Sequence, residues 1–186
     1  TAHLLVDVFG GRDSLVYRRL RDDLGLVYAA YFHQAYKWQA GWILGFLGCK
    51  GDQTPRALQE TARLMRSLQE EIPRDELEQK RLDALNSFVF NVDTPAALTS
   101  VYAHYRMRGE PLDTLERIQE AFMQAEREEL LELARTYLDP ERLQIFVVGD
   151  GTLSVVQEDG SRVPLKQALQ ATAEDMGLPC KELPLE

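Results

Sequence analysis

Helical spacing of apolar residues dominates this chain on both sides of one strand-like region. Apolar side chains recur at this spacing in residues 1–9 and 14–24, and glycine follows each stretch, as at a helix end. The same spacing predicts further helices at residues 54–72, 75–91, 94–108, 111–118 and 123–138. Threonine followed by proline at positions 54–55 and 94–95 is typical of a helix start.

Two neighbouring runs have the aromatic and β-branched composition of strands. Residues 26–34 and 40–49 are separated by a short polar break and therefore predict an antiparallel hairpin. The second run is apolar on both alternations and contains glycines, which predicts a strand covered on both faces or closely approached by other backbone. Residues 143–149 are a compact apolar run that we expect to return to the same sheet as a strand.

The order of these elements predicts an α+β fold with a mostly antiparallel sheet covered on one face by helices. Residues 1–150 form the main unit in this interpretation. Residues 151–186 have a different pattern of apolar and polar residues, and we expect them to be a C-terminal appendage with a small hairpin and a short helix. The longest nearly uncharged apolar run, residues 40–49, is about half of the roughly 20 residues that a membrane-spanning helix needs, so no membrane span is expected.

Composition and charge narrow the function classes. The chain has 186 residues, of which 45% are hydrophobic, enough to bury a core. Thirty acidic against 21 basic residues give a net charge of -9, which argues against nucleic acid as a partner. The two cysteines are far apart, and no two of the three histidines have the spacing to share a metal on one helix. The chain also lacks zinc-hydrolase, serine-hydrolase and phosphate-loop motifs, so we expect it to bind no metal or cofactor.

The neighbouring residues best suited to a role in binding or catalysis are Arg21 and Tyr28. Arg21 falls in the last turn of a predicted helix, Gly25 reverses the chain, and Tyr28 begins the next strand. Both polar ends are therefore expected at one end of the sheet, where a guanidinium and a phenol can donate to a peptide carbonyl or an oxyanion. The alternative is structural: Arg21 pairs with Asp22, Asp23 or another carboxylate, and Tyr28 is a half-buried strand aromatic.

Other side chains near the hairpin are each compatible with a binding role or a structural role. Four aromatic residues suit either binding of an extended peptide or packing in the core, and they are Tyr31, Tyr36, Trp38 and Trp42. His33 ends the first strand, where a lone histidine is usually a simple hydrogen-bonding residue. The acidic stretch at 126–132 predicts a solvated helix face, and Cys49 a buried small hydrophobe.

A resemblance to a known family follows from the N-terminal motif. The run Phe9-Gly-Gly11, Ser14-Leu15, Leu20-Arg21, Gly25-Leu26 and Tyr28 resembles the signature of the non-catalytic half of pitrilysin/insulinase-type zinc peptidases, which include mitochondrial processing peptidase subunits. The similarity extends over about residues 1–150. It implies that Arg21 and Tyr28 correspond to the family's arginine and tyrosine that reach the carbonyl of a bound peptide, and that zinc belongs to the partner half.

What this resemblance implies is a non-catalytic half of a zinc metalloendopeptidase that helps to form the peptide chamber. His33 becomes a candidate for the chamber wall. The expected partners are a peptide substrate and a catalytic half-domain, in the same parent chain or on a partner subunit, and the chain alone is predicted to be inactive. The family's first strands are expected to be missing here, and an open sheet edge favours pairing with a second copy. The rival interpretation is a structural or assembly module of the same fold. The bacterial cytoplasm and the periplasm are both consistent with the sequence as the compartment of this chain.

Overall fold

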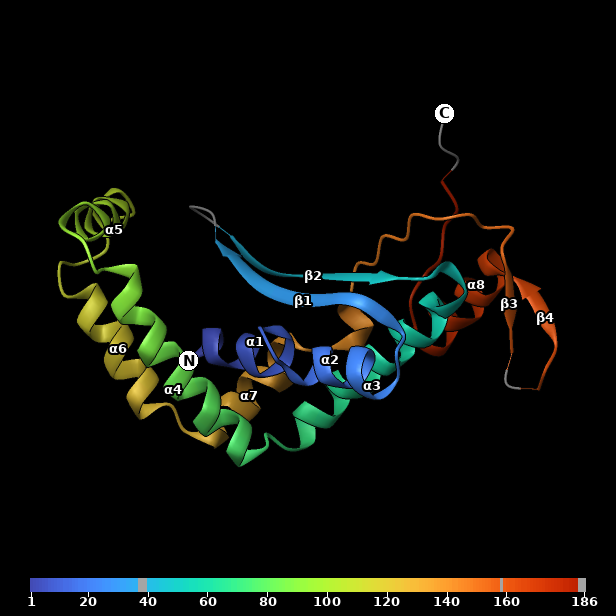
Figure 1. Ribbon diagram of the computed structural model, residues 1–186, viewed down its shortest axis with the longest axis horizontal. Helices are drawn as coiled ribbons and strands as arrows, with labels where there is room; N and C mark the ends of the chain where they lie inside the picture. The colour runs from blue at the N-terminus through green and yellow to red at the C-terminus, as the bar shows by residue number, and fades with distance from the viewer. Residues whose placement is uncertain (37–39, 158, 184–186) are drawn as a thin grey trace.

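The computed structural model describes residues 1–36, 40–157 and 159–183. It places a long two-stranded ribbon over a layer of helices, with a helical arm at one end and a small module at the other (Figure 1). The elements in chain order are α1 (Ala2–Gly10), α2 (Leu15–Tyr17), the π-helix η1 (Arg18–Asp23), β1 (Val27–Tyr36), β2 (Gly41–Cys49), η2 (Gly51–Gln53), α3 (Thr54–Glu70), α4 (Arg74–Asn91), α5 (Pro95–Met107), α6 (Thr114–Gln124), α7 (Arg127–Tyr137), η3 (Pro140–Arg142), β3 (Ser154–Val156), β4 (Arg162–Pro164) and α8 (Leu165–Asp175).

The ribbon of β1 and β2 is antiparallel, and its alternation separates two faces. Phe32 is on the inner face, where its ring lies 4.8 Å from the ring of Phe9 on α1. The approach is close because the two residues that bracket this ring have no side chain: a Cβ on Gly10 or on Gly45 would lie 2.4 Å or 2.1 Å from atoms of Phe32. Glycine at these two positions therefore lets the ribbon dock directly on α1.

Helix α1 is the centre of the main core. It is buried on nearly every side, with α2, α3, α4, α7 and β1 packed around it. Two buried charged groups support this layer. Glu60 of α3 accepts from Arg63 and from Arg19 Nε at 3.4 Å, and Lys80 of α4 donates to the main-chain carbonyl of Arg12. Pairing of this kind is what allows a charge to stay inside a protein.

The arm consists of α4, α5 and α6. Helix α4 packs against α1 at its base and against α6 along its length. Helix α5 lies at the tip and has no buried residue among those described (Figure 1). Its capping is still well formed, because Thr94 Oγ1 accepts from the Ala97 N–H at 3.1 Å.

The C-terminal module has its own small hydrophobic cluster, formed by Val155, Leu165 and Ala168. Strands β3 and β4 make a short antiparallel hairpin, and α8 follows it and packs against α3. The division of the chain at residue 150 into two domains stays a prediction.

The expected fold class is confirmed, because the structure is α+β with antiparallel sheets and helices on one face of the ribbon. Two expectations about the sheet are wrong for the described residues. The run at 143–149 pairs with no strand. Strand β2 is covered only on its inner face, and Trp42, Leu44 and Phe46 on the other face are each at least 44% exposed.

Candidate functional site

Strand β1 begins with a β-bulge at Tyr28. Val27 lies opposite Cys49 and Ala29 opposite Gly48, so Tyr28 is the extra residue and has no partner in the register. A bulged residue loses ladder hydrogen bonds. Arg21 compensates for this loss: its Nη1 donates to the main-chain carbonyl of Tyr28 at 2.9 Å and more weakly to that of Val27 at 3.4 Å.

The turn between η1 and β1 holds Arg21 in this position. The Leu24 N–H donates to the Arg19 carbonyl at 3.2 Å, which is the wider spacing of a π-helix, and such turns are frequent at functional sites. Gly25 then takes a φ of 62°, a conformation that favours glycine. The Leu26 N–H closes the turn on the Leu20 carbonyl at 2.8 Å. The guanidinium of Arg21 therefore lies over the first residues of β1.

The phenol of Tyr28 stands on the exposed side of the ribbon. Its side chain is 66% exposed, and its ring lies against Gly48 so closely that a Cβ there would be 2.5 Å from Cζ. The hydroxyl makes no hydrogen bond with another described residue, so it is available as a donor to a ligand.

The rest of this side is apolar and aromatic. The register sets Tyr31 opposite Phe46 and His33 opposite Leu44, and Trp42 lies next in line on the same face. The ring of Tyr31 stacks on Phe46 with centroids 5.3 Å apart and on His33 at 6.1 Å. We call this surface the outer face, and its residues are Tyr28, Tyr31, His33, Trp42, Leu44 and Phe46.

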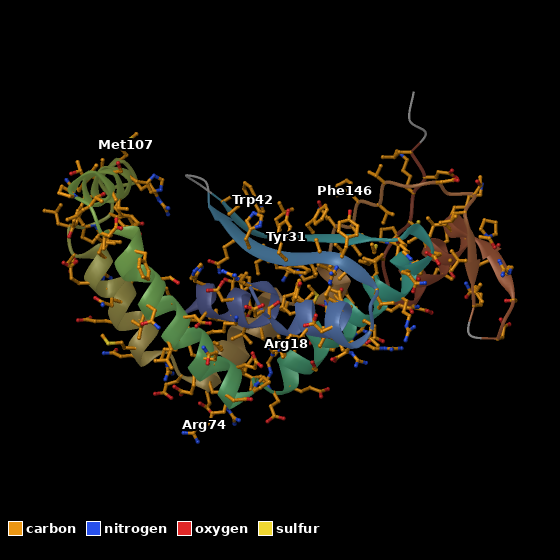
Figure 2. The ribbon with its side chains drawn as sticks, viewed as in Figure 1. Arg18, Tyr31, Trp42, Arg74, Met107 and Phe146 are labelled. Carbon is orange, nitrogen blue, oxygen red and sulfur yellow. The ribbon has the colours of Figure 1, made fainter. Side chains whose placement is uncertain are left out.

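The outer face is turned away from the helices. Figure 2 shows Tyr31 and Trp42 rising from the ribbon on the side opposite to α1, with Arg18 below on the helical side. A contiguous apolar surface of this kind on a folded chain usually marks a place where a peptide, a protein or a ligand binds. Aromatic residues are enriched at such contacts because they bury a large area.

The residues that the structure describes are not grouped as zinc ligands. The three histidines lie on different elements: His3 on α1, His33 on β1 and His104 on α5. His3 Nε2 contacts Asp7 at 3.3 Å, one turn further along α1. Within the described ranges no three His, Cys, Asp or Glu side chains are grouped as metal ligands. We therefore assign no metal-dependent step to this chain.

The arrangement of a helix-backed antiparallel ribbon with one bare face defines an α+β fold. The crystal structure of a peptidase M16 inactive domain from Pseudomonas fluorescens is similar to this chain, with a TM-score of 0.66 and 14% sequence identity. The match covers 73% of this chain and 33% of that chain, so this chain spans about a third of the length of the solved structure. No protein-family model and no curated protein matches the sequence. The chain has the fold of a peptidase inactive domain, and the resemblance expected from its sequence is confirmed at the level of fold.

The structure brings the Arg21 guanidinium to the main-chain carbonyl of Tyr28. In the described residues no ion pair joins Arg21 to Asp22 or Asp23, and Asp23 instead lies 3.6 Å from Arg19. The role of the pair toward a peptide stays a prediction. His33 is exposed on the outer face.

Sequence reasoning missed Leu44 and Phe46 as members of the outer face. Their alternation with Ile43, Gly45 and Leu47 was the available signal, but it was interpreted as a strand covered on both faces or closely approached by other backbone. Of the aromatic candidates, Trp38 and the side chain of Tyr36 lie outside the described residues. Cys49 is partly buried, with Sγ 3.3 Å from Thr54 Oγ1. None of the helices in the described ranges is long and apolar enough to cross a membrane.

Proposed function

We propose that this chain is the non-catalytic half of a zinc metalloendopeptidase and that its outer face forms one wall of the peptide chamber. The observation that carries the proposal is the bare aromatic face, on the side of the ribbon away from the helices. The similarity in fold to a peptidase inactive domain supports it. The partner is then a catalytic half-domain, in the same parent chain or on another subunit, and that half carries the zinc.

In this proposal Arg21 and Tyr28 contact the carbonyl of the bound peptide. Arg21 Nη1 is engaged with the bulge, whereas its Nε and Nη2 have no partner among the described residues. These N–H groups and the Tyr28 hydroxyl are donors at the same end of the ribbon. Fixed donors of this type stabilise the negative charge that develops on a carbonyl oxygen during peptide hydrolysis.

The test uses the assembled enzyme, with both halves present. Tyr28→Phe and Arg21→Ala should each lower kcat/KM by about 10- to 1000-fold, the range for a lost oxyanion donor. Tyr137→Phe is the matched control, because this tyrosine of α7 is similarly exposed, at 62%, and lies outside the outer face. Unchanged kinetics in both Tyr28→Phe and Arg21→Ala would contradict the assigned role.

The chain alone should cleave no peptide. Purified chain is incubated with a fluorogenic peptide mixture, with and without added zinc and then with a chelator. Stoichiometric bound zinc that supports chelator-sensitive cleavage would show that this chain carries its own catalytic site.

The second candidate is a structural or assembly module of the same fold. It is favoured by the hydrogen bond from Arg21 to its own bulge, which gives this residue a structural role without any peptide. Under this alternative, Arg21→Ala lowers the stability of the chain, and Tyr28→Phe leaves turnover unchanged. Measurement of unfolding and turnover on the same variants separates the two functions.

A further inference from the structure

The side chains on the outer side of the ribbon leave a gap beside the bulge. On β2 this side is occupied by Leu44, Phe46 and Gly48, which are two positions apart. Leu44 and Phe46 have large exposed side chains, whereas Gly48 has none. The register sets Gly48 opposite Ala29, the residue that follows Tyr28. Two small residues therefore lie side by side, and the surface between the strands is low at this point.

The β-bulge turns the side chain of Tyr28 toward this gap. Val27 and Ala30 are both buried, although a regular strand would place residues three apart on opposite faces. The extra residue of the bulge accounts for this difference, because it lets Tyr28 face outward between two residues that face the core. Bulges commonly redirect a side chain in this way.

The ring of Tyr28 lies directly on Gly48. A Cβ at position 48 would be 2.5 Å from Cζ, 2.6 Å from Cε2 and 2.8 Å from the hydroxyl oxygen of Tyr28. The atoms nearest to Gly48 are therefore those at the hydroxyl end of the ring. Neighbouring strands are about 4.8 Å apart, so the ring crosses from β1 to β2 and Gly48 supports its far end. This explains why Gly48 is buried beneath a tyrosine that is largely exposed.

Two contacts from different elements determine where the Tyr28 hydroxyl lies. Arg21 holds the main chain of the bulge through its hydrogen bond to the Tyr28 carbonyl at 2.9 Å. Gly48 determines how closely the ring approaches β2, because its main chain lies beneath the ring. Carbon atoms in contact are about 3.5–4.0 Å apart, so a methyl group on residue 48 would displace the hydroxyl end by about 1 Å or more. Gly48 has no positive φ, so its main chain can otherwise accept alanine.

We propose that Gly48 is a positioning residue, whose missing side chain sets the position of the Tyr28 hydroxyl relative to a bound peptide. The inference rests on the proposed function, in which this hydroxyl donates to the peptide carbonyl. A fixed donor stabilises an oxyanion only at hydrogen-bond distance, and a displacement of about 1 Å can lower the rate by about 100-fold. The rival role of the contact is structural, because an aromatic ring that covers a glycine on the neighbouring strand stabilises a sheet. That role does not need the hydroxyl.

The first test compares kinetics and stability of Gly48→Ala in the assembled enzyme with both halves present. Its kcat/KM should fall by about 10- to 100-fold, mainly through kcat, while the urea midpoint of unfolding stays at the wild-type value. Gly45→Ala is the matched control, because its new Cβ meets Phe32 on the inner face. This control should lower the midpoint and leave kcat/KM of the folded enzyme unchanged. Unchanged kcat/KM in Gly48→Ala, or equal losses of kcat/KM in both variants, would overturn the proposal.

The second test asks whether Gly48 acts through the hydroxyl of Tyr28. In Tyr28→Phe the hydroxyl is already absent, so adding Gly48→Ala should lower kcat/KM by less than about twofold further. A further loss as large as that in the wild-type background would overturn the proposal. A Tyr28→Phe enzyme as fast as the wild type would overturn the proposed function and this inference together. A slow Tyr28→Phe enzyme with an unaffected Gly48→Ala enzyme would overturn the role of Gly48 alone.

The third test examines the contact itself by NMR on the full chain, without any measurement of activity. A nuclear Overhauser effect is expected between a Gly48 Hα and the ε protons of Tyr28, because these atoms are in contact. The ring of Tyr31 provides the control, since it stacks on Phe46 and should show its effects to that ring instead. Absence of the effect between Gly48 and Tyr28 would overturn the proposal whatever the kinetics.

Discussion

One substitution, glycine to alanine, should have different outcomes at two positions of β2. Gly45 is on the inner face, where a new Cβ would lie 2.1 Å from Cε1 of Phe32, and the ring of Phe32 cannot retreat because Phe9 and Gly10 lie behind it. Gly48 is on the outer face, where a new Cβ would lie 2.5 Å from Cζ of Tyr28. That ring is 66% exposed, so it can turn into solvent.

The expected magnitudes follow from two opposing effects. Alanine restricts the unfolded chain and adds about 0.4–1 kcal/mol of stability wherever the backbone tolerates it. Neither glycine has a positive φ, so this gain applies at both positions. Gly45 itself is exposed and Gly48 buried, so the difference lies in the ring that each new Cβ would meet. Forcing a methyl group against a ring that is held in place costs about 1–3 kcal/mol, the range for overpacking. Gly45→Ala should therefore lower the free energy of unfolding by about 1–2 kcal/mol, and Gly48→Ala should leave it within about 0.5 kcal/mol of the wild type.

Urea unfolding followed by far-UV circular dichroism measures both variants under the same conditions. A double-mutant cycle with Phe32→Leu tests the cause, because a smaller side chain makes room for the new methyl group and should recover about 1 kcal/mol at position 45. Equal stability of Gly45→Ala and Gly48→Ala, or strict additivity with Phe32→Leu, would refute the argument that Phe32 is wedged between two glycines.

Two further predictions concern buried charge. Burial raises the pKa of Asp7 above its ordinary value of 3.8, and the charges of His3 and Lys80 act in the opposite direction. The folded state therefore holds the Asp7 proton more tightly than the unfolded state does. The stability that Asp7 contributes is present below pH 3.8 and is lost as the pH rises through the folded pKa. Asp7→Asn should therefore be more stable than the wild type at pH 7, with the difference shrinking below pH 3.8 in thermal unfolding across pH; a constant difference would contradict this. Glu60→Gln should lower the free energy of unfolding by about 1–2 kcal/mol because it removes the charge held between Arg19 and Arg63. Glu70→Gln, on the exposed end of α3, is the control and should change it little. Equal effects of the two variants in chemical unfolding would count against a role for the buried ion pairs of Glu60.

The glycines show how far sequence reasoning reached in this fold. Gly25 was expected to end a helix, and it has the positive φ of such a stop. Gly11 was expected to do the same, but its φ is -70°, and the neighbouring Gly10 lies under Phe32 instead. Local spacing identifies a glycine that the chain needs for a turn. It does not identify one that a distant strand needs for close approach, because the contact depends on the register of β1 and β2.

In the candidate site, too, the local features were predictable from the sequence and those that depend on strand register were not. The turn that brings Arg21 toward Tyr28 is local, and the order of helix, glycine and strand predicted it. The bulge at Tyr28 is not local, since it depends on which residue of β2 lies opposite, and so the hydrogen bond from Arg21 to the Tyr28 carbonyl could not be foreseen. The sequence therefore predicted that both residues lie at one end of the sheet, but not that the guanidinium binds the main chain there.

The two errors about the sheet have one physical cause. Residues 40–49 and 143–149 are apolar on both alternations, a pattern that selection against exposed apolar surface normally confines to strands covered on both sides. In this chain Ile43 and Leu47 on the inner side of β2 are partly buried, whereas Leu44 and Phe46 are exposed, and residues 144–149 are exposed on both alternations. An apolar pattern reports that a surface is buried in the functional state but not which polypeptide buries it. The outer face is therefore where another polypeptide is expected, and in the proposed function this is the bound peptide.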